Sequence, residues 1–87
     1  MAIDYSGLRS LTARELIAAL NRDGFHFVRQ AGSHQRCAHT DGRRVTVAPH
    51  GKDDSFRRKT LKSMIEDQAQ WTEDDLVRLG LLKRRSE

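Results

Sequence analysis

Histidine is concentrated in one part of this 87-residue chain, whose four histidines are His26, His34, His39 and His50. Histidine can take and give protons near neutral pH, because its unperturbed pKa lies there. His34 follows Gly-Ser at the start of a predicted strand, where the backbone can hold a side chain that stays open to solvent. There it could take a proton from a ribose 2′-hydroxyl or give one to a leaving 5′-oxygen. The 2′-hydroxyl is an internal nucleophile, so this chemistry needs no metal.

Other interpretations of these residues are weaker. A surface histidine without a role is the plain alternative for His34. A zinc set of His34, Cys37, His39 and His50 has a spacing that matches no common finger or ribbon. On a strand, Cys37 and His39 would share a face and His34 would point the other way. Cys37 also lies in mid-strand, away from any helix N-terminus that could activate its thiol. We therefore expect no metal, no cofactor and no cysteine nucleophile.

Basic side chains accompany the histidines. The chain has 16 Lys and Arg against 12 Asp and Glu, a formal net charge of +4, which suits a polyanionic partner. The predicted strands carry Arg36, Arg43 and Arg44, and an Arg-Arg-Lys run begins at Arg57. Such groups could neutralise phosphates. The alternatives are a solvated helix face for the run and an edge-protecting charge pair for Arg43 and Arg44.

A helix and a strand precede His34. Thr12 and Glu15 have the spacing of a capping box, and apolar residues follow at helical intervals. The pattern predicts a helix over 12–23 that ends at Gly24. Residues 25–31 are rich in aromatic and β-branched side chains and predict a strand with Phe25 and Phe27 on one face.

Two further strands are expected over 34–39 and 43–48. Gly32 and Ser33 would form the first turn. Asp41 and Gly42 indicate a two-residue type I′ turn, in which both central residues have positive φ. Three consecutive strands with short turns predict an antiparallel meander.

Helical patterns return after the strands. Ser55 is a plausible N-cap for a second helix with an apolar stripe (Leu61, Met64, Ile65, Ala69). Trp71 should close the core, and Thr72 should cap a short helix over 73–79 that ends at Gly80. The order helix, three strands, helix, short helix predicts an α+β two-layer sandwich, an order shared with double-stranded-RNA-binding domains.

The chain as a whole indicates one domain, 1–87. A single cysteine rules out an internal disulfide and favours the reducing cytoplasm. The N-terminus lacks the features of a signal peptide, and no apolar run is long enough to span a bilayer.

Several motifs together resemble one family. They are Gly-Ser-His-Gln-Arg from Gly32, Asp-Gly-Arg-Arg-Val-Thr-Val from Asp41, Pro-His-Gly-Lys from Pro49 and Lys-Thr-Leu-Lys-Ser-Met-Ile from Lys59. With the leading helix, residues 12–65 resemble the HicA (YcfA-like) toxin family.

The resemblance implies a fold like a double-stranded-RNA-binding domain and a ribosome-independent mRNA interferase, the toxin of a type II toxin–antitoxin pair. It implies that His34 is the catalytic residue. It also implies a HicB-type antitoxin that covers the active site and usually carries a DNA-binding domain, so that DNA is met only indirectly.

Further roles follow as expectations. Arg36 and Lys52 would stabilise charge on the scissile phosphate. Arg43, Arg44, Arg57 and Arg58 would position the RNA strand without reading bases. One histidine cannot obviously be both acid and base, so His50 or a water molecule would be the second proton carrier.

The chain departs from the family pattern in two places. Lys59 stands where the family usually has Gly before the Thr-Leu of its second helix, which leaves the start of that helix open. The chain also extends beyond the family's usual end, and residues 72–87 could pack on the core or contact the antitoxin. A non-catalytic module of the same fold, binding RNA or a protein, is the alternative function.

Overall fold

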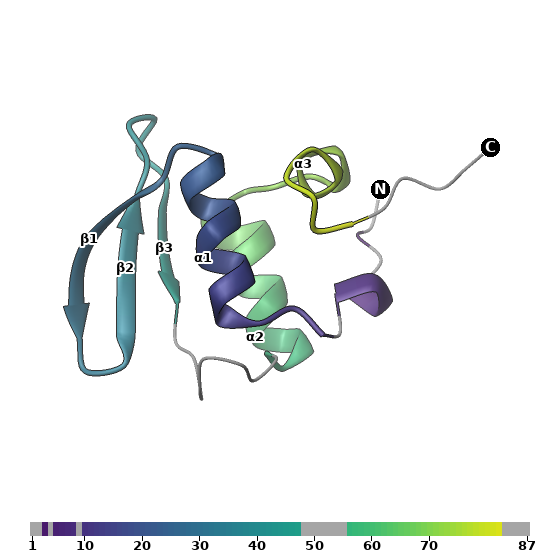
Figure 1. Ribbon diagram of the computed structural model, residues 1–87, viewed down its shortest axis with the longest axis horizontal. Coiled ribbons are helices and arrows are strands. Elements are labelled where there is room, and N and C mark those ends of the chain that lie inside the picture. The colour runs from purple at the N-terminus through teal and green to yellow at the C-terminus, as the bar shows by residue number, and fades with distance from the viewer. Residues whose placement is uncertain (1–2, 4, 9, 48–55, 83–87) are drawn as a thin grey trace.

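The computed structural model describes residues 3, 5–8, 10–47 and 56–82, with a sheet on one side of the molecule and the helices on the other (Figure 1). The elements are η1 (Tyr5–Leu8), α1 (Ala13–Arg22), β1 (His26–Ala31), β2 (His34–Ala38), β3 (Arg44–Val47), α2 (Arg58–Lys62), the π-helix η2 (Ser63–Gln68) and α3 (Glu73–Arg78). The sheet is antiparallel with strand order β1-β2-β3. The predicted α+β order is confirmed.

The first helix forms as its sequence predicts. Thr12 accepts a hydrogen bond from the Glu15 N–H, and the Glu15 side chain accepts one from the Thr12 N–H, so the capping box is present. Gly24 ends the helix with a φ of +100°. A Cβ at Gly24 would lie 2.9 Å from Nε2 of His39, so this position excludes a side chain on two grounds.

The two turns of the sheet differ. Ala31 pairs with His34, so Gly32 and Ser33 form a two-residue turn, and Gly32 has a φ of +63°. The type I′ turn expected at Asp41 and Gly42 is wrong. The Gly42 N–H donates to the His39 carbonyl and the His39 N–H to the Arg43 carbonyl, and of the residues 40–42 only Gly42 has positive φ. The loop is therefore one residue longer, with glycine at its left-handed position.

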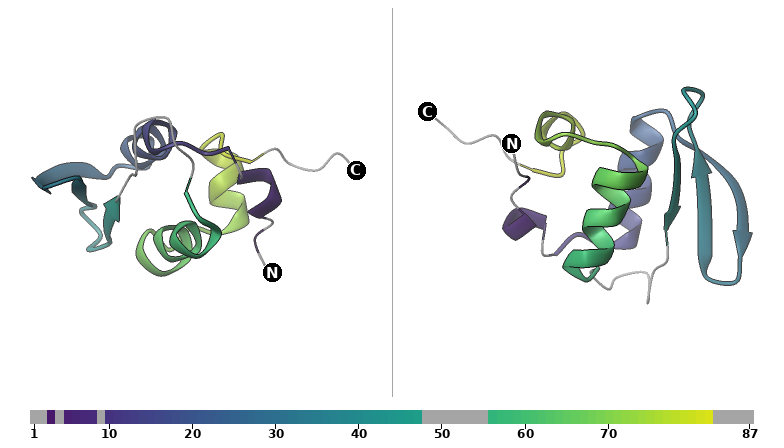
Figure 2. Two further views of the ribbon diagram at one scale, coloured as in Figure 1. Left: turned by 90° about the horizontal axis from the view of Figure 1, so that it is seen from below. Right: turned by 180° about the vertical axis from the view of Figure 1, so that it is seen from behind.

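The sheet buries only part of its inner face. Cys37, Val45 and Val47 are buried against the helices. β1 lies farthest from the helices, and all six of its residues are exposed (Figures 1 and 2). Phe27 therefore remains 55% exposed, whereas Phe25, just before the strand, is buried. The helices therefore cover Phe25 but leave Phe27 exposed, although the sequence predicts both on the same face of the strand.

The free edge of β3 is covered by η2. The predicted apolar stripe of Leu61, Met64, Ile65 and Ala69 is buried. Gln68 at the end of the π-helix accepts a hydrogen bond of 2.8 Å from the Thr46 N–H of β3. α2 begins at Arg58, and Ser55, the predicted N-cap, lies outside the described residues.

The C-terminal extension packs on the core as far as it is described. Trp71 is buried as predicted, and Thr72 and Asp75 form a second capping box for α3. Leu76 and Leu79 are buried, and Gly80 follows with a φ of +81°. η1 and α3 lie together beyond the helix layer, away from the sheet (Figures 1 and 2). No helix in the described part of the chain has the length and apolar content to cross a membrane.

Candidate functional site

His34 is the first residue of β2, directly after the Gly32-Ser33 turn. Its side chain is exposed and makes no hydrogen bond or ion pair with any other described residue. Side chains alternate along a strand, and Cys37 points into the core, so His34 and Arg36 lie on the opposite, solvent-facing side. The residue opposite His34 is Ala31, whose side chain is a single methyl group.

We call this side of the sheet the outer face. The strand register places alternate side chains on this face, pointing away from the buried Cys37, Val45 and Val47. The residues of the outer face are His26, Arg29, Ala31, His34, Arg36, Ala38, Arg44 and Thr46. The three strands contain no Asp or Glu. The outer face is therefore basic, and it brings two of the predicted site residues, Arg36 and Arg44, onto the same surface as His34.

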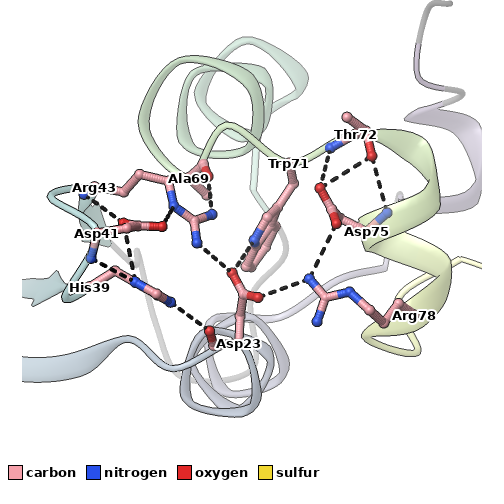
Figure 3. A network of polar contacts seen from close by, with 9 residues as sticks. All are labelled: Asp23, His39, Asp41, Arg43, Ala69, Trp71, Thr72, Asp75 and Arg78. Carbon is pink, nitrogen blue, oxygen red and sulfur yellow. Dashed lines mark hydrogen bonds and ion pairs between the residues drawn. The ribbon is translucent and has the colours of Figure 1, made fainter.

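Arg43 lies elsewhere, although it neighbours Arg44. Its Nε is 2.7 Å from Oδ2 of Asp41, and its Nη1 donates to the Ala69 carbonyl at 2.7 Å (Figure 3). Its Nη2 is 3.3 Å from Oδ2 of Asp23, and its guanidinium lies 4.9 Å from the centre of the Phe25 ring. The side chain is 20% exposed. These contacts hold the Arg43 side chain in a network away from the outer face.

His39 belongs to the same network. Its Nε2 lies 2.8 Å from the Asp23 carbonyl and its Nδ1 accepts from the Asp41 N–H at 3.1 Å, so the ring donates through Nε2 (Figure 3). Asp41, in turn, has its pKa lowered by the Arg43 backbone N–H and side chain. Both ring nitrogens of His39 are engaged in holding the loop after β2 against the end of α1. His39 is thus a structural histidine.

Asp23 is the centre of this network. Its side chain is 8% exposed and accepts hydrogen bonds of 2.8 Å from Nε1 of Trp71 and from Nη2 of Arg78 (Figure 3). Burial alone would raise the pKa of this carboxyl, but these bonds and the Arg43 charge outweigh it and hold the pKa below its usual value. The sequence offers no local signal for this role, because its partners come from three distant segments.

The second group of predicted cations is on the helix layer. Arg57 and Arg58 are exposed, and Arg58 lies 5.9 Å from the centre of the Tyr5 ring. α2 and β2 begin at the same end of the molecule (Figure 1). No described contact joins these arginines to His34. His50 and Lys52, the other predicted site residues, lie outside the described residues.

A metal ion and the thiol of Cys37 are the alternatives to His34 that the sequence raises. Among the described residues, no three His, Cys, Asp or Glu side chains are grouped so that they could hold a metal ion. Cys37 is buried, and burial raises the pKa of its thiol, which disfavours the nucleophilic thiolate.

The comparison with protein families gives one match. A family model described as the HicA toxin of bacterial toxin–antitoxin systems matches residues 13–71, from the start of α1 to Trp71. No curated protein matches the chain. The matched region contains the whole sheet and the Asp23–Trp71 contact, whereas η1 and α3 lie outside it.

Proposed function

Because the chain belongs to the family of HicA toxins of bacterial toxin–antitoxin systems, we propose that it is an endoribonuclease that cleaves mRNA without a metal, with His34 as general acid or base. The observation that carries this proposal is the exposure of the His34 side chain and its lack of hydrogen bonds to other described residues. His34 lies on a face that bears arginines and no acid. The other described histidine of the β2 segment, His39, is engaged in the structure.

The proposed reaction is an internal transesterification. The 2′-oxygen attacks the adjacent phosphorus, and the bond from phosphorus to the 5′-oxygen breaks, which leaves a 2′,3′-cyclic phosphate and a 5′-hydroxyl. One proton leaves the 2′-hydroxyl and one reaches the 5′-oxygen. His34 moves one of these protons, and His50 or a water molecule moves the other. Lys52 stabilises the added charge on the reacting phosphate, while Arg36, Arg44, Arg57 and Arg58 hold the flanking RNA strand.

The test is RNA cleavage by purified protein, with induced expression in cells beside it. Loss of a general acid or base typically slows a reaction by about 10²–10⁴-fold, and His34→Ala and His34→Gln should do so with unchanged thermal stability. His26→Gln is the matched control, because His26 is also exposed on the outer face. If the His34 variants cleave as fast as the wild type, His34 is not the catalyst. If the wild type binds RNA without cleaving it, the chain is a binding module.

Membership of the family also means that the toxin has an antitoxin partner. We propose that this partner is a HicB-type protein that covers the outer face with acidic side chains. Co-expression with the product of the neighbouring gene should give a complex that protects RNA. The absence of a complex, or a complex that leaves cleavage unchanged, would remove this part of the proposal.

A further inference from the structure

Arg29 and Arg36 stand directly opposite each other on the outer face. The register pairs Arg29 of β1 with Arg36 of β2, and Thr46 of β3 lies on the other side of Arg36. Both arginine side chains are exposed, and neither side chain forms a hydrogen bond or ion pair within the described part of the chain. Like charges directly opposite on neighbouring strands are unfavourable. Repulsion between these two side chains therefore destabilises the protein when no ligand is bound. An anion bound between them would remove this repulsion.

The pair also lies at a defined place relative to His34. Arg36 is the next residue after His34 on the same face of β2, and same-face neighbours on a strand are roughly 6.5 Å apart. Ala31, opposite His34, adds only a methyl group to this part of the outer face. Two guanidinium groups, each with several N–H donors in a plane, can bind the oxygens of one phosphate from two sides.

We propose that Arg29 and Arg36 form a binding site for a single RNA phosphate, the neighbour of the phosphate that reacts at His34. This inference rests on the proposed function, because it takes His34 as the point of cleavage. The RNA backbone then follows β2 across the outer face, and the Thr46 hydroxyl is within the same row of side chains. Arg29, which matches no motif in the sequence, becomes a substrate-positioning residue.

The test measures RNA binding in the His34→Ala background, so that cleavage does not interfere. A short fluorescently labelled single-stranded RNA is titrated at several salt concentrations against the full chain carrying Arg29→Gln, Arg36→Gln or both. Each single change should weaken binding by about tenfold, the value typical of a charge-assisted contact. The double change should weaken binding by clearly less than the product, because both arginines share one phosphate.

The salt dependence counts the phosphates. For single-stranded nucleic acid, each neutralised phosphate contributes about 0.7 to the slope of log K against log salt. The double variant should therefore lose about 0.7, whereas two separate phosphate contacts would lose about 1.4. Lys62→Gln is the charge-matched control, because Lys62 is exposed on α2 in the other layer. It should change binding by less than about threefold.

Three outcomes overturn the inference: Arg29→Gln binds RNA like the Lys62→Gln control, the double variant is fully multiplicative with a slope loss near 1.4, or the variants weaken only the complex with the antitoxin. A thermal melt at low salt guards against misfolding, since Arg29→Gln relieves repulsion and should melt at or above the wild-type temperature. The two proposals can fail separately. If Arg29 and Arg36 do not share a phosphate, His34-dependent cleavage can still be observed, and if the protein never cleaves RNA, the predicted binding can still be observed.

Discussion

The indole Nε1 of Trp71 donates a 2.8 Å hydrogen bond to the carboxylate of Asp23, 48 residues earlier in the chain. Through this contact the last residue of the family-matched region is tied to the end of α1. Arg78, which lies beyond that region, binds the other oxygen of the same carboxylate. The C-terminal extension of this chain thus completes a network that begins inside the family fold.

Asp23→Asn should destabilise the protein at neutral pH and matter less in acid. The pKa of Asp23 is lowered in the folded state. Its charge therefore stabilises the fold fully at pH values above the ordinary carboxyl pKa of 3.8, and this stabilisation is lost as the pH falls through the folded-state pKa. We expect a loss of about 1–3 kcal/mol at pH 7. The gap in unfolding free energy from the wild type, measured by urea titration, should narrow below about pH 4. A constant gap from pH 7 to pH 3 would contradict the role of the charge.

Arg43→Gln and Arg44→Gln should differ strongly in stability, although the residues are adjacent. Arg43 binds Asp23, Asp41 and the Ala69 carbonyl, and its removal leaves a largely buried carboxylate with fewer partners. The expected cost is about 2–3 kcal/mol. Arg44 is exposed, and its replacement should stay within about 0.5 kcal/mol while weakening RNA binding. Chemical denaturation checks both, and equal stabilities would refute the assignment of Arg43 to the network.

Gly24→Ala should cost more than Gly42→Ala. Both glycines have a φ of +100°, so both substitutions carry the strain of a left-handed backbone, about 1 kcal/mol or more. Only at Gly24 would the new Cβ meet a neighbour, Nε2 of His39 at 2.9 Å, whereas the space at Gly42 is open. The difference between the two melting temperatures therefore measures the steric term at His39. Identical losses would mean that the His39 ring moves aside without cost.

Gln68→Ala should expose the edge of β3. The change removes the acceptor of the Thr46 N–H and should cost about 1 kcal/mol. It should also speed hydrogen exchange at that amide. Gln30→Ala is the control, because within the described part of the chain the Gln30 side chain bonds only to the Gly32 carbonyl, in an exposed turn. If Thr46 exchanges equally slowly in both variants, Gln68 does not protect the edge.

Local sequence signals predicted the ends of α1 and α3 and the strand order well. Thr12 with Glu15, and Thr72 with its first-turn acids, act within four residues, so their capping is visible without knowledge of the rest of the chain. The prediction for the turn at Asp41 was wrong by one residue in the length of the loop. The type I′ turn requires positive φ at both Asp41 and Gly42, but only Gly42 has it, because the pair of His39 and Arg43 closes a longer loop.

The sequence predicts only those parts of the candidate site that depend on neighbouring residues in the chain. The place of His34 after a Gly-Ser turn follows from neighbouring residues. The different environments of Arg43 and Arg44 do not follow from the sequence, because Arg43, just before β3, reaches Asp23, whose position depends on distant packing. Arg29 was overlooked for a related reason, since its pairing with Arg36 depends on the irregularity that shifts the register of β1 between Phe27 and Arg29.

The length of the chain between the partners in the Asp23 network has a kinetic consequence. Asp23 and Arg78 are separated by 55 residues, and Tyr5 and Glu66, which form a second long-range bond, by 61. Contacts across such loops form after local ones, because loop closure costs entropy before the contact returns any stabilisation. The hairpin that carries His34 can fold early during synthesis. The bond from Arg78 to Asp23 can close only after the ribosome has released Arg78, so it is among the last contacts of the network to form.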